Sequence, residues 1–204
     1  MGAVRLSDRR GLSKSSQRRG CRMRYERVVL VSPRYDVGPN ALADHPPSGL
    51  GYLSQALEDA HIDHMVIDQR VGLSDDDMLT RIAQYEPDLI GISMMTYLHQ
   101  HTYATIRKVR AAWSRADIIV GGPHVSTLRE AVLGECLEID FGAVLEGEGT
   151  LTELCLGRSI ESIEGLIHRD GDDVIFNVLS VPQPKPLADG FLNRTIYATV
   201  RAAP

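Results

Sequence analysis

The chain alternates between short apolar runs and longer stretches in which apolar residues recur every three or four positions. The short runs have the composition of buried strands, and we expect strands at 28–31, 64–67, 89–93, 118–120 and 141–145. The longer stretches predict helices at about 49–60, 74–85, 100–113, 127–133 and 150–157. Strands that are apolar on both faces and separated by helices indicate a parallel sheet covered on both sides. Five such units predict an α/β, flavodoxin-like fold with strand order 2-1-3-4-5.

After residue 157 the pattern changes to that of a β-hairpin. Apolar segments at 166–169 and 174–178 flank the sequence Asp170-Gly171-Asp172-Asp173, in which Asp-Gly is a common turn signal. The prolines between 182 and 186 then predict an extended linker. We therefore expect a disordered basic tail at 1–26, a binding domain with a C-terminal hairpin at 27–180, and a proline-rich linker with a short tail at 181–204.

Charge is unevenly distributed along the chain. The formal net charge is −5, and residues 1–27 contribute +7 to it, so the remainder carries −12. An acidic body argues against a nucleic-acid partner for the folded part. For residues 1–26 a basic arm, a transit segment and a disordered tail all stay open.

The composition also bears on location. No apolar run is long enough to cross a membrane, so no membrane partner is expected. The three cysteines, Cys21, Cys136 and Cys155, are too few for a disulfide framework and lack metal-ligand spacing. Because no signal peptide precedes the first strand, the expected location is a reducing cytoplasm.

Small residues gather where three of the predicted strands end. Ser93 ends the third strand, Gly121-Gly122 end the fourth, and Glu146-Gly147-Glu148-Gly149 follow the fifth. In an open parallel sheet, ligands bind beyond the carboxyl ends of the strands. A large cofactor that lies against this edge needs side chains to be absent there, because each Cβ atom would occupy its volume. The pattern therefore predicts a cofactor site at this edge.

Four motifs in consistent order carry a resemblance to a known family. They are Pro46-Pro47-Ser48-Gly49-Leu50-Gly51-Tyr52, Gly91-Ile92-Ser93, Gly121-Gly122-Pro123-His124-Val125-Ser126 and Gly147-Glu148-Gly149-Thr150. Over about 160 residues the chain resembles the N-terminal cobalamin-binding domain of cobalamin-dependent radical S-adenosylmethionine enzymes. In that family the nucleotide tail of cobalamin runs past a Ser-x-Leu segment and a Gly-Gly pair, which match Ser93-Met94-Met95, with Met in place of Leu, and Gly121-Gly122 here.

The resemblance implies cobalamin as the cofactor of this chain. It implies no catalytic residue and no protein metal ligand. The implied cofactor-binding residues are Ser93, Met94, Met95, Thr96, Gly121, Gly122, Pro123, His124, Glu146, Gly147, Glu148 and Gly149. As a test, a bulky residue in place of Gly121 or Gly122 is expected to abolish cofactor binding and to leave the fold intact.

Two motifs of related proteins are absent. The Asp-x-His-x-x-Gly motif, whose histidine ligates cobalt, does not follow the first strand, where residues 32–38 read Ser-Pro-Arg-Tyr-Asp-Val-Gly. The Cys-x-x-x-Cys-x-x-Cys motif is also absent, so we expect no iron–sulfur cluster in this chain. The expected protein is a cobalamin-binding module that acts in radical chemistry only with a catalytic domain or a separate radical S-adenosylmethionine chain.

Several alternatives stay open. A flavodoxin-like flavin or nucleotide binder has the same fold, and so does a degenerate fragment that acts only by protein contact. His124 either touches the cofactor or caps the following helix, and Met94 and Met95 are either cofactor wall or core. Glu146 and Glu148 are either an acid/base pair or a loop anchor. A receiver domain is disfavoured because Ser93 stands where its aspartate would be.

Overall fold

A single mixed sheet forms the centre of the molecule. The computed structural model describes residues 23–34 and 47–179. The sheet order is β2-β1-β3-β4-β5-β6-β7, with β1 to β5 parallel and β6 and β7 antiparallel to their neighbours. The predicted order 2-1-3-4-5 is thus confirmed. The strands are β1 (Arg27–Ser32), β2 (Asp63–Asp68), β3 (Leu89–Ser93), β4 (Asp117–Gly121), β5 (Phe141–Ala143), β6 (Leu166–Asp170) and β7 (Asp173–Phe176).

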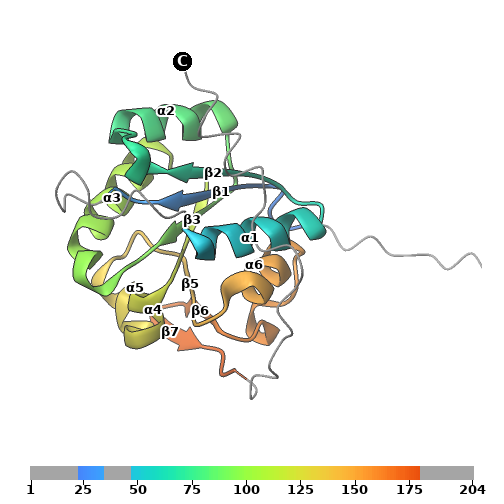
Figure 1. Cartoon of the computed structure of the whole chain (residues 1–204). Coiled ribbons are helices and arrows are strands. Elements are labelled where there is room, and N and C mark those ends of the chain that lie inside the picture. The colour runs from blue at the N-terminus through green and yellow to red at the C-terminus, as the bar shows by residue number, and fades with distance from the viewer. Residues whose placement is uncertain (1–22, 35–46, 180–204) are drawn as a thin grey trace, which may run out of the picture.

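Helices cover both faces of the sheet. Figure 1 shows α1 and α6 side by side on one face, where they contact each other. Residues of α2, α3, α4 and α5 pack in the apolar cluster on the opposite face. The helices are α1 (Ser48–Asp59), α2 (Asp75–Tyr85), α3 (His99–Ala112), α4 (Pro123–Leu128), α5 (Glu130–Glu135) and α6 (Gly147–Cys155), with short 3-10 turns η1 (Gln69–Val71), η2 (Thr96–Leu98) and η3 (Ile160–Ser162).

Each buried strand contributes to both faces because its side chains alternate. On β1, Val29 and Val31 belong to the apolar cluster beneath α2–α5, whereas Val28 and Leu30 belong to the cluster beneath α1 and α6. All four side chains are at most 2% exposed. The continuous apolar runs in the sequence are thus explained by burial on both sides.

The start of α2 is fixed by a reciprocal pair of hydrogen bonds. The Ser74 hydroxyl accepts a hydrogen bond from the Asp77 backbone N–H at 3.1 Å, and the Asp77 carboxylate accepts one from the Ser74 N–H at 3.0 Å. This reciprocal pair is a capping box, which satisfies two N–H groups that the helix itself cannot bond. The acidic first turn also suits the positive end of the helix.

Two predicted helices differ from the structure. The single helix expected at 127–133 is wrong, because α4 and α5 are separated by Arg129, whose φ of 50° is left-handed. The helix expected from residue 150 begins at Gly147 instead, so the Gly-Glu-Gly segment is its first turn. The predicted hairpin is confirmed, and it extends the sheet because β6 pairs with β5.

Residues 23–26 pack against the domain, although the sequence analysis assigned them to the tail. The backbone N–H groups of Arg24 and Tyr25 donate to the Cys155 carbonyl, and Tyr25 is 5% exposed. The rest of the predicted tail, most of the loop at 32–38 and the linker and tail at 181–204 lie outside the described residues. Among the described helices, none is both long and apolar enough to span a bilayer.

Candidate functional site

The floor of the candidate site is a row of small residues at the carboxyl ends of three neighbouring strands. Ser93 on β3 pairs with Gly121 on β4, and Gly121 pairs with Ala143 on β5. Side-chain alternation places this row on the α1/α6 face, two residues beyond Ile119 on the same strand. Since none of the three side chains is larger than a hydroxymethyl group, the row leaves open space beneath the helices.

Gly91 lies one step nearer the middle of the sheet and also lines the hollow. Gly91 on β3 stands between Leu30 on β1 and Ile119 on β4 in the strand register. A Cβ atom at Gly91 would lie 2.9 Å from Leu30 Cδ2. The Leu30 side chain therefore occupies part of the space that a larger residue at position 91 would need.

Helices α1 and α6 close this hollow into a cavity of about 250 Å³. Leu50 and Leu53 line it from α1, and Leu151 lines it from α6. The segment between β5 and α6 borders it with Leu145 and Glu146, and the first turn of α6 borders it with Gly147 and Glu148. Its walls are mainly apolar, and the structure places it beyond the carboxyl ends of β3–β5, the edge at which open parallel sheets bind ligands.

The charges at the site are few. Among the described residues that line the cavity, Glu146 and Glu148 are the ionisable ones, and none is Lys, Arg or His. Within 23–34 and 47–179, no three His, Cys, Asp or Glu side chains come together as metal ligands. Burial raises the pKa of Cys136 to about 11 and that of Cys155 to about 12, so both remain neutral thiols, and neither lines the cavity.

A family model described as the B12 binding domain matches residues 36–155, which is more than half of the chain. The chain belongs to the B12-binding domain family. All residues that line the cavity, apart from Leu30, lie within the matched range. The resemblance that the four sequence motifs predicted is thereby confirmed.

Relatives of this B12-binding domain include two methyltransferases. An uncharacterised methyltransferase of Pyrococcus horikoshii is 32% identical over 182 residues, covering 79% of this chain and 38% of the relative. Cytidylyl-2-hydroxyethylphosphonate methyltransferase of Streptomyces wedmorensis is 25% identical over 179 residues, covering 73% of this chain and 32% of the relative. The B12-binding domain described here thus spans about a third of the length of the curated relatives it matches.

A solved structure has the same fold. The radical S-adenosylmethionine methyltransferase TsrM from Kitasatospora setae, with cobalamin and a [4Fe-4S] cluster bound, superposes with a TM-score of 0.63 at 23% identity. The match covers 78% of this chain and 30% of that one. At this identity the likeness bears on the fold of the B12-binding domain alone.

The structure brings half of the predicted cofactor-binding residues together around the cavity. They come from the ends of β3 and β4, from Glu146 just before α6, and from the first turn of α6, which are separated in the sequence. These six are Ser93, Gly121, Gly122, Glu146, Gly147 and Glu148. Their contact with a cofactor stays a prediction.

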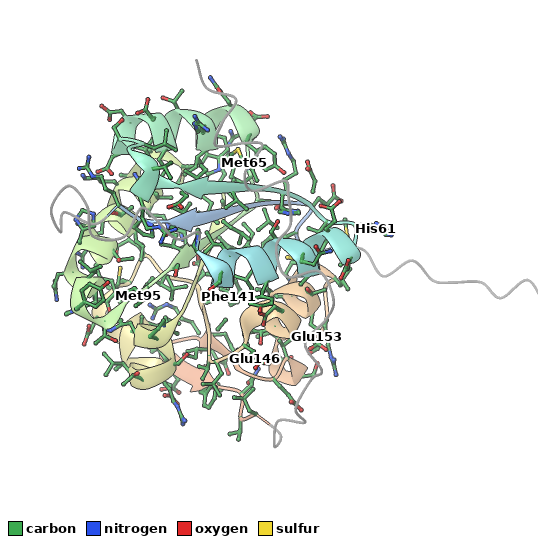
Figure 2. The ribbon with its side chains drawn as sticks, viewed as in Figure 1. His61, Met65, Met95, Phe141, Glu146 and Glu153 are labelled. Carbon is green, nitrogen blue, oxygen red and sulfur yellow. The ribbon has the colours of Figure 1, made fainter. Side chains whose placement is uncertain are left out.

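The other six predicted residues do not line the cavity. Met94 is fully buried in the cluster beneath α2–α5, because it follows Ser93 and its side chain takes the opposite face. Met95, Thr96, Pro123 and Gly149 lie outside the cavity lining, and Figure 2 shows Met95 beyond the carboxyl ends of the strands, with His61 at the opposite edge.

His124 lies in a buried polar cluster on the other face. It is 1% exposed, and its Nε2 lies 3.3 Å from the Tyr103 hydroxyl, which donates to the Glu135 carboxylate at 2.9 Å. The His99 ring stacks on the His124 ring with centroids 4.8 Å apart. Burial, and then the neighbouring His99, lower the pKa of His124, which favours a neutral ring. His124 thus packs behind the Gly121-Gly122 segment and does not enter the cavity.

Gly122 has a structural role that differs from that of Gly121. Its φ is 106°, and a Cβ atom there would lie 2.8 Å from the Met94 carbonyl oxygen. A Cβ atom at Gly121 meets only Ala143, at 3.8 and 3.9 Å. A bulky residue at Gly122 is therefore expected to strain the backbone as well as to affect binding, whereas Gly121 has the space that such a test needs.

Several lining residues were not predicted as site residues. Leu30 and Ile119 are strand residues that lie beside Gly91, and this position follows only from the register of β1, β3 and β4. Leu50, Leu53 and Leu151 carry a helical apolar pattern that equally suits an ordinary core. Gly91 lies in the Gly91-Ile92-Ser93 motif, which was the signal available in the sequence, whereas its position between Leu30 and Ile119 follows from the strand register.

Proposed function

We propose that this domain binds cobalamin at the cavity between α1, α6 and the carboxyl ends of β3–β5. The observation that carries the proposal is the row Ser93–Gly121–Ala143, which opens an apolar cavity within the range matched by the B12 family model. A cavity of about 250 Å³ is far too small for a corrin macrocycle. We infer that a slender part, the nucleotide tail, enters between the helices and that the macrocycle lies outside the mouth.

The lining of the cavity supports an uncharged, flat insert. Leucine side chains form the roof, and glycine backbone forms part of the floor, so an aromatic base would bury apolar area on both of its faces. The Ser93 hydroxyl and the Glu146 and Glu148 carboxylates are the polar side chains available for hydrogen bonds. None of the described lining residues is cationic, so an anionic group of the ligand would depend on backbone N–H groups there.

We further propose that the domain serves a radical S-adenosylmethionine methyltransferase whose catalytic part lies outside these 204 residues. The methyltransferases among its relatives support this assignment, and so does the share of their length that the chain spans. The bound cofactor would supply the chemistry, while the residues of this chain bind it and orient it. The proposal includes that the iron–sulfur cluster belongs to that other part, either a further domain or a separate chain.

The first test is uptake of cobalamin by the full 204-residue chain. The protein would be mixed with hydroxocobalamin and desalted, and the visible spectrum of the protein fraction would be recorded. Near-stoichiometric cobalamin in that fraction is the expected result. A folded, colourless protein would contradict the proposed function, and flavin mononucleotide retained in a parallel sample would favour the flavodoxin-like alternative.

The second test locates the site. Gly121→Leu places a side chain in the cavity without a clash at its Cβ atom, so cobalamin affinity should fall by at least about 100-fold while the protein stays folded. Gly134→Leu on α5 is the matched control, because a Cβ atom there meets nothing within 4 Å and the residue does not line the cavity. A folded Gly121→Leu protein with the affinity of the control would place the site elsewhere.

A further inference from the structure

Leu145 presents an apolar side chain to solvent at the mouth of the cavity. It lines the cavity, yet 59% of its surface is exposed. A leucine at the edge of an apolar hollow would be expected to pack inward, as Leu50 and Leu151 do with 4% and 3% exposure. The open position of Leu145 therefore needs a cause.

The cause lies in the backbone. Leu145 has a φ of 63°, in the left-handed region that is unfavourable for any residue with a Cβ atom. Four described non-glycine residues have a positive φ, and the other three are His61, Glu86 and Arg129. Those three are polar or charged residues that follow the ends of helices, where left-handed backbone commonly terminates a helix. Leu145 alone among them is apolar and borders the cavity.

A hydrogen-bonded clamp holds this conformation. The Leu145 backbone N–H donates to Ser126 Oγ at 2.9 Å, and the Ser126 hydroxyl donates to the Gly122 carbonyl at 3.0 Å. The chain of bonds joins the turn after β4 to the turn after β5, and both turns border the cavity. Strained backbone that is held by such contacts is typical of ligand-binding positions.

We propose that Leu145 contacts the bound ligand and covers its apolar surface at the cavity mouth, and that Ser126 is the positioning residue that holds Leu145 there. This inference rests on the proposed function and names a binding residue for it. The ligand surface that fits is the apolar face or edge of a large ring system that extends out of the cavity. Burial of the leucine side chain against that surface would offset the strain of its backbone.

The test measures hydroxocobalamin affinity of the full chain by titration. Leu145→Ala removes the contacting atoms and keeps a Cβ atom, and Leu145→Gly also relieves the backbone strain. Both variants should bind about tenfold more weakly than the wild type, which corresponds to the loss of two to three buried carbon atoms. Their melting temperatures should equal or exceed that of the wild type, since the side chain is exposed in the ligand-free protein and glycine suits the left-handed backbone.

A matched control separates strain from contact. Glu86→Gly relieves the same kind of backbone conformation at the end of α2, away from the cavity, so its cobalamin affinity should equal that of the wild type. Ser126→Ala should weaken binding by about threefold, and Ser126→Thr, which keeps the hydroxyl, should restore it. In the Leu145→Ala background, Ser126→Ala should have no further effect on affinity, because its role passes through Leu145.

The outcomes distinguish this inference from the proposed function. If the wild type binds cobalamin and Leu145→Ala binds it equally well, the inference is overturned and the proposed function stands. A lower melting temperature for Leu145→Ala, with affinity unchanged once folded protein is counted, would give Leu145 a purely structural role. If the wild type binds no cobalamin, both the proposed function and the inference fail.

Discussion

The two faces of the sheet differ most at the carboxyl ends of β3 and β4. On the face beneath α2–α5, Ile92 and Val120 fill the space as members of a continuous apolar cluster. On the face beneath α1 and α6, the neighbours of these two residues in the sequence are Gly91, Ser93 and Gly121. These three small residues line the cavity. Large and small side chains thus alternate at the carboxyl ends of these strands. Among the described residues, the α1/α6 face is open only at this edge of the sheet, because residues such as Leu30 and Ile119 pack it nearer the middle.

The largest expected effect on stability comes from removing atoms on the filled face. Ile118 is fully buried beneath α2–α5, so Ile118→Ala should lower the free energy of unfolding by about 2–5 kcal/mol in denaturant titration. The comparison is Gly121→Ala on the same strand, whose added Cβ atom meets only Ala143 at ordinary contact distance. That variant should change the free energy of unfolding by less than about 1 kcal/mol. A large loss in the free energy of unfolding for Gly121→Ala would mean that the space beside Gly121 is filled.

The next-largest effect on the free energy of unfolding is expected at Gly122, in the turn between β4 and α4. Gly122→Ala should lower the free energy of unfolding by about 2–3 kcal/mol, since it combines a left-handed φ of 106° with a Cβ atom 2.8 Å from the Met94 carbonyl. Gly72→Ala is the control, with a φ of 98° and nothing within 4 Å of its Cβ atom, so it should lose only about 1 kcal/mol. Equal losses in thermal or denaturant unfolding would show that the contact with Met94 is easily relieved.

A smaller effect depends on pH and concerns the polar cluster within the filled face. Burial lowers the pKa of His124, so the unfolded chain, with a histidine pKa near 6.5, binds more protons than the folded one. Stability should therefore be greatest above about pH 6.5 and fall as the pH decreases toward the folded-state pKa, by about 1.4 kcal/mol for each unit by which that pKa is lowered. Denaturant titrations at pH 7.5 and pH 5.5 measure the slope.

Two variants test whether His124 causes this dependence of the free energy of unfolding on pH. His124→Gln should reduce the loss of stability between the two pH values, while His61→Asn, which replaces an exposed histidine at a left-handed position, should leave it unchanged. The same dependence in wild type and His124→Gln would assign the slope to other groups. Cobalamin affinity of the folded protein should be little affected by either variant, because neither residue lines the cavity.

The strands and their order could be predicted from the sequence because each strand is apolar on both faces and is bounded by turn residues. The position of the site could also be predicted, since Ser93 and Gly121 end neighbouring strands. Ala143, the third residue of the row, could not, because its place beside Gly121 depends on the register of β5 against β4. The register is a property of the packed sheet rather than of the local sequence.

Other differences have similar local reasons. Nothing in an arginine at position 129 signals the left-handed backbone that separates α4 from α5. The glycines at 147 and 149 favoured a loop over the first turn of α6. Met94 and His124 follow site residues in the sequence but belong to the opposite face, as alternation along a strand and packing of α4 require. Met94 and His124 were thus predicted to line the site because they are close to Ser93 and Gly122 in the sequence, but they lie on the opposite face of the sheet.

The hairpin of β6 and β7 also determines at which edge of the sheet Leu179 lies. Since β6 runs against the parallel strands and β7 reverses again, the chain returns to the edge that holds the cavity. Leu179 there lies close to Gly165, whose carbonyl accepts a hydrogen bond from Val144 just after β5. Arg24, by contrast, is tied to Cys155 at the other edge of the sheet. A reporter domain joined directly after residue 179 would therefore begin at the edge of the sheet that holds the cavity, whereas one joined ahead of Met23 would begin at the opposite ends of the strands.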